Sequence, residues 1–204
     1  MSDHLYPGGP EDIAPPEPTE TTPWNIPNAL TTFRIILVPI FAWMQLSHPD
    51  DPWWRFWTAV VFLVAILTDT ADGMIARRLN IVTRFGKLAD PIADKALTGM
   101  AFIGFSVNGE LPWWVTIAIL VREWGITIMR FVVLRYGVMA AGRGGKTKTV
   151  AQAVAVILYL LPLPEWARPI AVAVMAVAFV LTMVTGLDYV RDAIKLRRTS
   201  STRR

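Results

Sequence analysis

The sequence predicts an all-α, polytopic integral membrane protein with six transmembrane helices. Hydrophobic residues make up 53% of the 204 residues and mean hydropathy is +0.42, which is too apolar for an ordinary soluble domain. Several apolar runs are long enough to cross a bilayer. The chain has no cysteine, which excludes disulfides, zinc–thiolate sites and cysteine nucleophiles. Its two histidines, His4 and His48, lie in a tail and a turn and do not suggest a metal site.

Three regions differ in composition. Residues 1–23 contain six prolines and five acidic residues but no lysine or arginine, which predicts a disordered tail. Residues 24–195 carry the apolar runs and are expected to form one membrane domain, followed by a basic C-terminal tail at 196–204. Because the basic residues gather at the ends of the apolar runs, the sequence does not suggest a nucleic-acid partner.

Hydropathy and turn residues define the expected helices. Tryptophans and prolines punctuate the chain between apolar runs, as in SHPDDPWWR at 47–55 and LPLPEWARP at 161–169. Basic loops are expected at 77–87 and 140–149, the second of them rich in glycine. The predicted spans are 29–46, 54–68 (continuing as helix through 76), 86–107, 113–136, 150–161 and 170–187.

The charges between the spans predict the orientation of the chain. An even number of spans places both termini on one side of the membrane. That side carries the C-terminal tail and most of the loop cations, whereas the other side carries Arg55 and Arg168. By the positive-inside rule both termini are cytoplasmic. The loop cations on the cytoplasmic side are Arg77, Arg78, Arg84, Lys87, Arg143, Lys146 and Lys148.

Four carboxylates lie at the ends of two predicted spans. Asp69 and Asp72 are three residues apart, and Asp90 and Asp94 are four apart. In a helix both spacings place the pair on one face. Carboxylates at membrane depth are costly unless they pair, line a polar cavity or bind cations. Because neighbouring carboxylates repel and oxygen ligands suit hard ions, the cluster predicts a Mg²⁺ or Mn²⁺ site.

The chemistry of this cluster leaves three functions open. Two ions held by carboxylates can clamp both sides of a phosphoryl transfer, which indicates a metal-dependent transferase. The same carboxylates suit a divalent-cation transporter, or structural hydrogen bonds in an assembly protein. The cations of Arg77, Lys146 and Lys148 favour the transferase, because a cation pathway gains little from cations beside it.

The carboxylate stretch has a fixed pattern, D-x2-D-G-x2-A-R-x8-G-x3-D-x3-D. It resembles the CDP-alcohol phosphotransferase family of integral-membrane phospholipid synthases in all eight fixed positions and all spacings. The six-span layout resembles that family as well, so the likeness covers about residues 24–195. The eight positions are Asp69, Asp72, Gly73, Ala76, Arg77, Gly86, Asp90 and Asp94.

This resemblance implies a two-metal reaction on a CDP-linked lipid. Asp69, Asp72 and Asp90 would bind two divalent ions, and Asp94 would touch the second ion and act as general base on the acceptor hydroxyl. The hydroxyl oxygen would attack the lipid-side phosphorus, and CMP would leave. The implied CDP-lipid contacts are Asn28, Thr31, Gly73, Arg77 and Thr83. For Asn28 and Thr31, helix capping is an equally good interpretation of the residues.

Three further stretches, NIPNALTTFRIILVPIF, VREWGITIMR and GGKTKT, resemble the branch of the family that makes phosphatidylglycerol phosphate. The acceptor in that branch is sn-glycerol 3-phosphate, whose phosphate needs cations. The acceptor contacts implied are Thr32, Arg122, Arg130, Lys146 and Lys148. For the two lysines, the alternative interpretation is the ordinary positive charge of a cytoplasmic loop.

Two arginines within the predicted spans have alternatives to a substrate role. Arg34, near the start of the first span, is expected to snorkel to the headgroups. Pairing of Arg122 with Glu123 is disfavoured, because adjacent helical side chains point apart.

Other acceptors remain open within the family. A cardiolipin synthase would use phosphatidylglycerol, and a phosphatidylinositol-phosphate synthase would use inositol phosphate. The expected partners are CDP-diacylglycerol, sn-glycerol 3-phosphate and the lipid bilayer, and the resemblance implies a homodimer. The expected location is the cell (inner) membrane, with the active site facing the cytoplasm.

Overall fold

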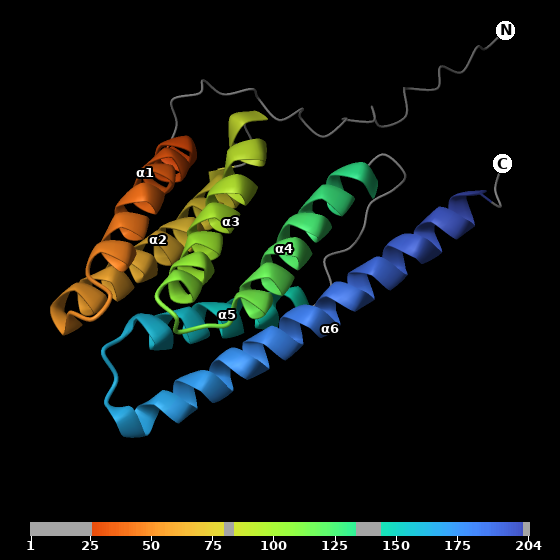
Figure 1. The fold of residues 1–204 in the computed structure, drawn as a ribbon. Helices are drawn as coiled ribbons and strands as arrows, with labels where there is room; N and C mark the ends of the chain where they lie inside the picture. Colours follow the sequence, from red (N-terminus) through yellow and green to blue (C-terminus); the bar gives the residue numbers. More distant parts are fainter. Residues whose placement is uncertain (1–25, 80–83, 134–143, 202–204) are drawn as a thin grey trace, which may run out of the picture.

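The computed structural model describes residues 26–79, 84–133 and 144–201, with side chains in 28–71, 74, 89–129 and 147–191. These ranges hold six α-helices, one 3-10 helix and no strand, which confirms the predicted all-α fold (Figure 1). The elements are α1 (Ile26–Ser47), α2 (Pro52–Leu79), α3 (Arg84–Val107), α4 (Trp113–Val133), α5 (Gly144–Leu160), η1 (Glu165–Ala167) and α6 (Arg168–Ser201).

Turn residues define the helix ends. The Asp51 carboxylate accepts the backbone N–H of Trp53 at 2.8 Å and so caps α2 directly before Pro52. Between α3 and α4, Gly109 has a φ of +73°, a conformation that residues with side chains rarely adopt. The N–H of Glu110 then returns to the carbonyl of Phe105 at 2.8 Å, which closes the turn.

Three helices are long and apolar enough to cross a membrane, among the residues described: Asn28–Ser47, Pro52–Ala71 and Glu165–Arg191. With 24 and 21 residues, α3 and α4 are about 36 and 32 Å long and could also span. Their charged residues lower the hydropathy of both. With 17 residues, α5 is about 26 Å long, slightly shorter than a bilayer core.

Several helices extend beyond the predicted bounds. The loop expected over 77–87 is wrong for residues 77–79 and 84–87, which belong to α2 and α3. The helix α5 begins at Gly144, so the expectation of a loop over 140–149 is wrong for residues 144–149. Lys146 and Lys148 therefore lie in the first two turns of a helix. Glycine is a poor helix former, but Lys148 is buried against α4, and this tertiary contact offsets the weak local propensity. The helix α6 continues to Ser201, through most of the basic stretch expected as a tail.

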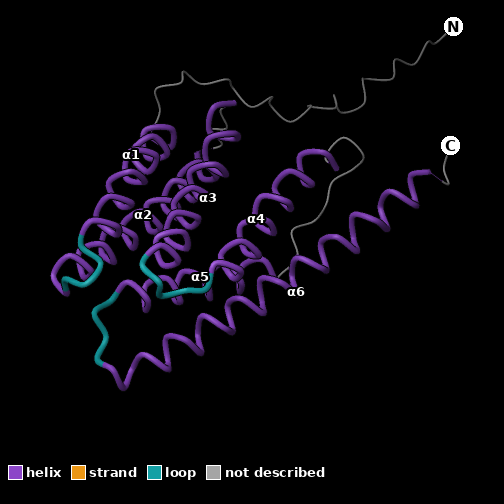
Figure 2. Tube along the Cα trace, in the orientation of Figure 1, coloured by secondary structure: helices purple, strands orange, loops and turns teal. Residues whose placement is uncertain are grey.

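The helices pack as a bundle, and the connections that the structure describes lie at one end of it. The helix α1 packs against α2 and α3, α6 packs against α4 and α5, and α2 also contacts α5 (Figure 1). The connections at 48–51, 108–112 and 161–167 lie together at what we call the turn end (Figure 2). The carboxylates of α2 and α3 lie toward the opposite end, since α2 starts and α3 finishes at the turn end.

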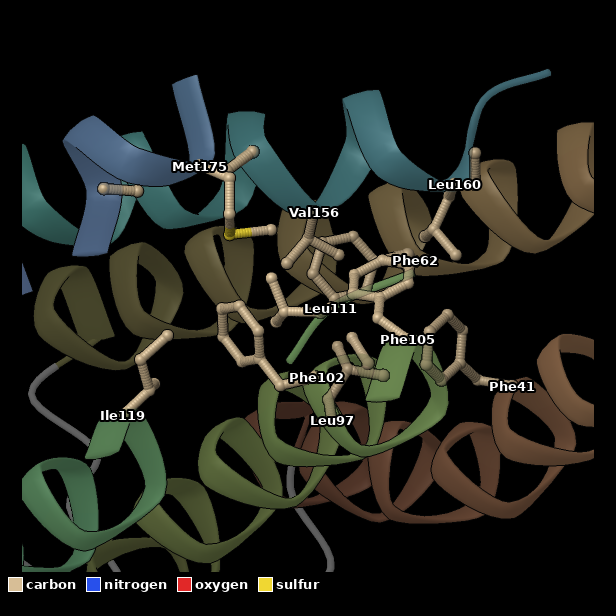
Figure 3. Packing of buried hydrophobic residues seen from close by; sticks show 14 of the residues in the cluster. Phe41, Phe62, Leu97, Phe102, Phe105, Leu111, Ile119, Val156, Leu160 and Met175 are labelled. Carbon is tan, nitrogen blue, oxygen red and sulfur yellow. The ribbon is translucent and has the colours of Figure 1, made fainter. Parts of the chain in front are cut away.

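The core contains buried side chains from all six α-helices, including Ile119 of α4 and Met175 of α6 (Figure 3). The rings of Phe41 and Phe62 are fully buried with centroids 5.6 Å apart. Alanines alternate with these rings and let the helices approach closely, as in membrane bundles. Many large apolar side chains point outward instead, as expected for a surface in contact with lipid, among them Ile36, Leu67, Val121, Ile128, Val177 and Leu187.

One arginine ties the turn end together. Arg55 of α2 donates to the carbonyl of Pro49 at 2.9 Å, to the carboxylate of Glu110 and to the carbonyl of Tyr159. These groups come from the three connections or their flanking helix ends. The polar ends of α1, α3 and α5 are therefore fixed to one side chain.

Candidate active site

Two carboxylates from different helices meet polar side chains of α1. Arg34 is buried, with 1% of its side chain exposed, and its Nη1 lies 2.5 Å from Oδ1 of Asp69 on α2. Thr31 is also buried and donates its hydroxyl to Oδ1 of Asp90 on α3. Because Thr31 and Arg34 are three residues apart, they share one face of α1. This face orients carboxylates of both α2 and α3.

Asp94 begins a second set of contacts. It lies one turn along α3 from Asp90, and its Oδ2 accepts the ammonium of Lys95 at 2.9 Å. The same ammonium lies 2.9 Å from Oε2 of Glu123 on α4. A continuous set of charges thus joins Asp94 to α4.

Glu123 is the centre of these contacts. Its carboxylate is buried, and it accepts Lys95 of α3, the neighbouring Arg122 at 2.9 Å and Lys148 of α5. We call these four residues the Glu123 cluster. A buried carboxylate is costly unless it is paired, and here three cations from three helices pair with it.

Both sets of charges open into one cavity of about 170 Å³. The rest of its wall is largely apolar and includes Phe62, Phe102 and Ile119. Carboxylates and cations on one wall suit a substrate that brings phosphate together with metal cations. The charged lining residues come from five helices: Arg34, Asp69, Asp94, Lys95, Glu123 and Lys148.

A larger cavity, about 480 Å³, lies at the turn end. It is lined by Arg55, Glu110 and Arg168 and by none of the site residues that the sequence predicts. Its principal cation is already bonded to Glu110 and to two carbonyl groups. We therefore assign the active site to the smaller cavity.

The Arg122 side chain does not line the cavity that Lys148 lines, and it contacts α6 instead. Its Nη2 donates to the hydroxyl of Thr185 on α6 at 2.8 Å. A Cβ on Gly186 would lie 2.9 Å from Cγ of Arg122, so glycine is needed for the arginine to cross α6. The expectation that Arg122 and Glu123 would not pair is wrong, because the long arginine side chain curves back along the helix to reach its neighbour.

Two expectations for α1 are also wrong. Arg34 does not snorkel, because the carboxylate of Asp69 offers a closer partner than the headgroups. Since α1 already begins at Ile26, Thr31 lies inside the helix and does not cap it. Asn28 is buried in the first turn, whereas Thr32 is exposed and its hydroxyl bonds back to the Asn28 carbonyl at 2.9 Å.

Several predicted site residues lie outside the described side chains. Thr83 falls in the undescribed stretch 80–83, and the others have a described helical backbone only. Their proposed roles therefore stay predictions. These residues are Asp72, Gly73, Arg77, Thr83, Arg130 and Lys146.

Sequence reasoning missed two residues of the cavity wall, Lys95 and Glu123, and misjudged Arg34. A signal existed for the first two. Lys95 directly follows Asp94, and Glu123 is a lone acid within an apolar span, which is costly unless a partner is near.

The donor set fits a hard divalent cation. Among the described side chains, no three carboxylate or imidazole groups gather closely enough to hold a metal ion. However, Asp69 and Asp94 line the same cavity and keep 44% and 39% of their side chains exposed, so an ion in the cavity can reach them. Carboxylate oxygens are the ligands that Mg²⁺ and Mn²⁺ prefer.

Comparison with known proteins bears on the same residues. Residues 24–184 match the CDP-alcohol phosphatidyltransferase family. The chain is 45% identical to the probable phosphatidylglycerophosphate synthase of Mycobacterium tuberculosis over 184 residues, 87% of each chain. It is 38% identical to the CDP-diacylglycerol–glycerol-3-phosphate 3-phosphatidyltransferase of Bacillus subtilis over 192 residues, 87% of this chain and 100% of the relative. The Escherichia coli protein of that name is 38% identical over 177 residues, covering 83% of this chain and 95% of its own.

The matched residues contain the whole carboxylate stretch and every charged residue of the cavity wall. The match also covers well over half of the chain. This chain therefore belongs to the CDP-alcohol phosphatidyltransferase family.

Proposed function

We propose that this chain transfers a phosphatidyl group from CDP-diacylglycerol to sn-glycerol 3-phosphate, giving phosphatidylglycerol phosphate and CMP. The observation that carries the proposal is that Asp69, Asp94, Lys95 and Lys148 line the same cavity. The names of the Bacillus subtilis and Escherichia coli relatives support this choice of substrates. Family membership favours the transferase over a divalent-cation transporter or an assembly protein.

The membrane topology we propose has six spans with both termini cytoplasmic. The shared position of the described connections supports it, as does the excess of cations on the other side. In the cell (inner) membrane, the cavity would then face the cytoplasm, where glycerol phosphate is dissolved. The acyl chains would remain in the lipid around the helices, and a homodimer stays a prediction.

The metal ligands in this proposal are Asp69, Asp72, Asp90 and Asp94, which would hold two Mg²⁺ or Mn²⁺ ions. When bound, the ions supply positive charge to the diphosphate and to the departing CMP. Arg34 and Thr31 would keep Asp69 and Asp90 in place, as second-layer hydrogen bonds do in other metal sites. The proposed CDP-lipid contacts are Asn28, Thr31, Gly73, Arg77 and Thr83.

Asp94 is the proposed general base. Its carboxylate accepts the proton of the acceptor hydroxyl while the hydroxyl oxygen bonds to the lipid-side phosphorus. The bond from this phosphorus to the bridging oxygen of the diphosphate breaks, and CMP leaves with the electron pair. Lys95 is bonded to Oδ2 of Asp94 and keeps the carboxylate at the cavity wall.

The acceptor phosphate needs cations close to Asp94. Lys148 lines the cavity and is the described member of the predicted set that can reach it. Thr32 and Arg122 do not line it, and they would need a different side-chain position to touch the acceptor. Arg130 and Lys146 remain predicted contacts.

An acceptor panel tests the proposal. Purified protein in liposomes receives CDP-diacylglycerol, Mg²⁺ or Mn²⁺, and one of three acceptors: glycerol 3-phosphate, phosphatidylglycerol or inositol phosphate. CMP release with glycerol 3-phosphate alone, abolished by EDTA, is expected. Release only with phosphatidylglycerol or only with inositol phosphate would reassign the acceptor to cardiolipin or phosphatidylinositol-phosphate synthesis.

A further inference from the structure

Glu123 has more cationic partners than its own charge requires. Its side chain is 7% exposed, and its two oxygens accept Lys95, Arg122 and Lys148. One carboxylate balances one cation, and Lys95 shares its charge with Asp94 as well. The Glu123 cluster together with Asp94 therefore carries three positive and two negative charges, and keeps an excess of positive charge at membrane depth.

The excess charge faces the cavity. Lys95 and Lys148 line the wall, whereas Arg122 points away to the hydroxyl of Thr185 on α6. Two ammonium groups on one wall suit a phosphate monoester, which carries close to two negative charges. The two lysines would repel each other if no carboxylate lay between them.

We infer that Glu123 is a positioning residue that holds the ammonium groups of Lys95 and Lys148 at the cavity wall, where they bind the phosphate of the acceptor. This inference rests on the proposed function, since it assumes an acceptor that carries phosphate. Arg122 joins the carboxylate to Thr185 of α6, in the space that Gly186 leaves free. Lys95 also joins this phosphate site to Asp94, so one side chain sets the distance between base and acceptor.

The substitution Glu123→Gln tests the inference, because the two electrostatic interpretations predict opposite results. If Glu123 positions the lysines, losing its charge lets them separate, and KM for glycerol 3-phosphate rises about tenfold, a change within the range of couplings between residues of one ion-pair network. If Glu123 merely competes with the phosphate for the lysines, the same KM falls. A lower or unchanged KM for glycerol 3-phosphate overturns the inference.

KM for CDP-diacylglycerol separates positioning from general damage. It is expected to stay within about twofold of wild type, the size of a neutral surface change. An equal rise in both KM values would mean that the variant only disturbs the fold, and would overturn the positioning role. Glu165→Gln is the matched control, because it removes the same charge from an exposed residue at the turn end.

Two further variants keep the test decisive if Glu123→Gln does not fold. Glu123→Asp retains the charge on a shorter side chain, and should raise the acceptor KM by less than the glutamine variant. Lys148→Met should raise it as well, and combining it with Glu123→Asp should add less than the sum of the two effects. Full additivity would show that Glu123 does not act through Lys148.

The wild-type acceptor panel separates this inference from the proposed function. If the panel selects inositol phosphate or phosphatidylglycerol, the proposed acceptor is wrong. The split between the two KM values is then measured with the selected acceptor, which also carries phosphate. A selective rise still supports the positioning role of Glu123, and an unchanged acceptor KM still overturns it.

Discussion

Asp94 lies where two groups of charges meet in the cavity wall. The cavity that Asp94 lines also includes the Arg34–Asp69 pair, and Lys95 joins Asp94 to the Glu123 cluster. A base at this boundary can take a proton from an acceptor whose phosphate lies toward Lys148. The proposed roles of the surrounding residues follow from this central position.

Substitution Asp94→Asn is expected to abolish turnover while CDP-diacylglycerol still binds. The amide keeps the size of the side chain but cannot take the proton, and a general base contributes about 10²–10⁴-fold to rate. CMP release and lipid-nucleotide binding are measured on the same preparation. Asp188→Asn, a change at an exposed carboxylate on α6, is the control and should behave as wild type. Turnover near the wild-type rate in the Asp94 variant would remove this residue as the base.

Thr31→Val tests whether α1 orients the metal ligands. The change keeps the shape of the side chain but removes the hydroxyl that donates to Asp90. The Mg²⁺ concentration for half-maximal activity should rise about tenfold, as for other residues that orient metal ligands. Thr68→Val removes a hydroxyl that bonds only within α2 in the described contacts, and should leave the Mg²⁺ dependence unchanged. Equal Mg²⁺ dependence in both variants would show that Thr31 has no such role.

The bundle is anchored at the turn end and carries the proposed active site toward the other end. Arg55 joins the α1–α2 connection to Glu110 and to the end of α5. None of these groups lines the cavity of the proposed active site. Because Arg55 fixes the turn end of α1, the positions of Thr31 and Arg34 are also fixed relative to α3 and α5.

Arg55→Met should therefore lower stability without changing substrate KM values. It leaves the Glu110 carboxylate, which is only 10% exposed, without its closest partner, which costs on the order of 2 kcal/mol. Thermal unfolding in detergent measures the loss. Arg168→Met is the matched control, because Arg168 is 63% exposed and 3.9 Å from the same carboxylate, and exposed pairs contribute little. Equal unfolding temperatures for the two variants would show that Arg55 does not anchor this end.

The helices themselves were largely predictable from sequence. Apolar runs and turn residues located α1 to α4 and α6, because a membrane span needs a long apolar segment whatever its neighbours are. The start of α5 was not predictable in this way. Its first residues, Gly144 and Gly145, favour a loop locally, and the contact of Lys148 with Glu123 comes from another helix.

The candidate site was predictable where chemistry follows chain spacing and not where it depends on packing. Asp90 and Asp94 share a helix face by their spacing alone. The partner of Arg34 depends on how α1 is rotated against α2, which spacing within one helix does not determine. Likewise, Glu123 acquires its role only when α3 and α5 pack beside α4.

The two ends of the bundle differ in the side chains that they carry. The site end has the carboxylates and the Glu123 cluster, and the turn end has exposed tryptophans such as Trp53, Trp114 and Trp166. Tryptophan belts mark the boundary between lipid and water. In the proposed topology, the turn end therefore lies at a membrane surface, and the proposed substrate site lies toward the opposite end.

Single introduced cysteines test the proposed orientation, and the absence of native cysteines makes the signal unambiguous. In intact cells, an impermeant maleimide should label Glu165→Cys at the turn end. Ser2→Cys should react only after the membrane is permeabilised. The reverse pattern would place the active site outside the cytoplasm and contradict the topology.

The most direct test of the central claim follows the acceptor into the lipid product. Radiolabelled glycerol 3-phosphate, CDP-diacylglycerol and Mg²⁺ or Mn²⁺ are given to purified protein in liposomes, and labelled lipid and CMP are counted together. Equal amounts of labelled phosphatidylglycerol phosphate and CMP are predicted, with both lost in EDTA and in Asp94→Asn. CMP released without labelled lipid would contradict the account, because water or another alcohol would then be the acceptor.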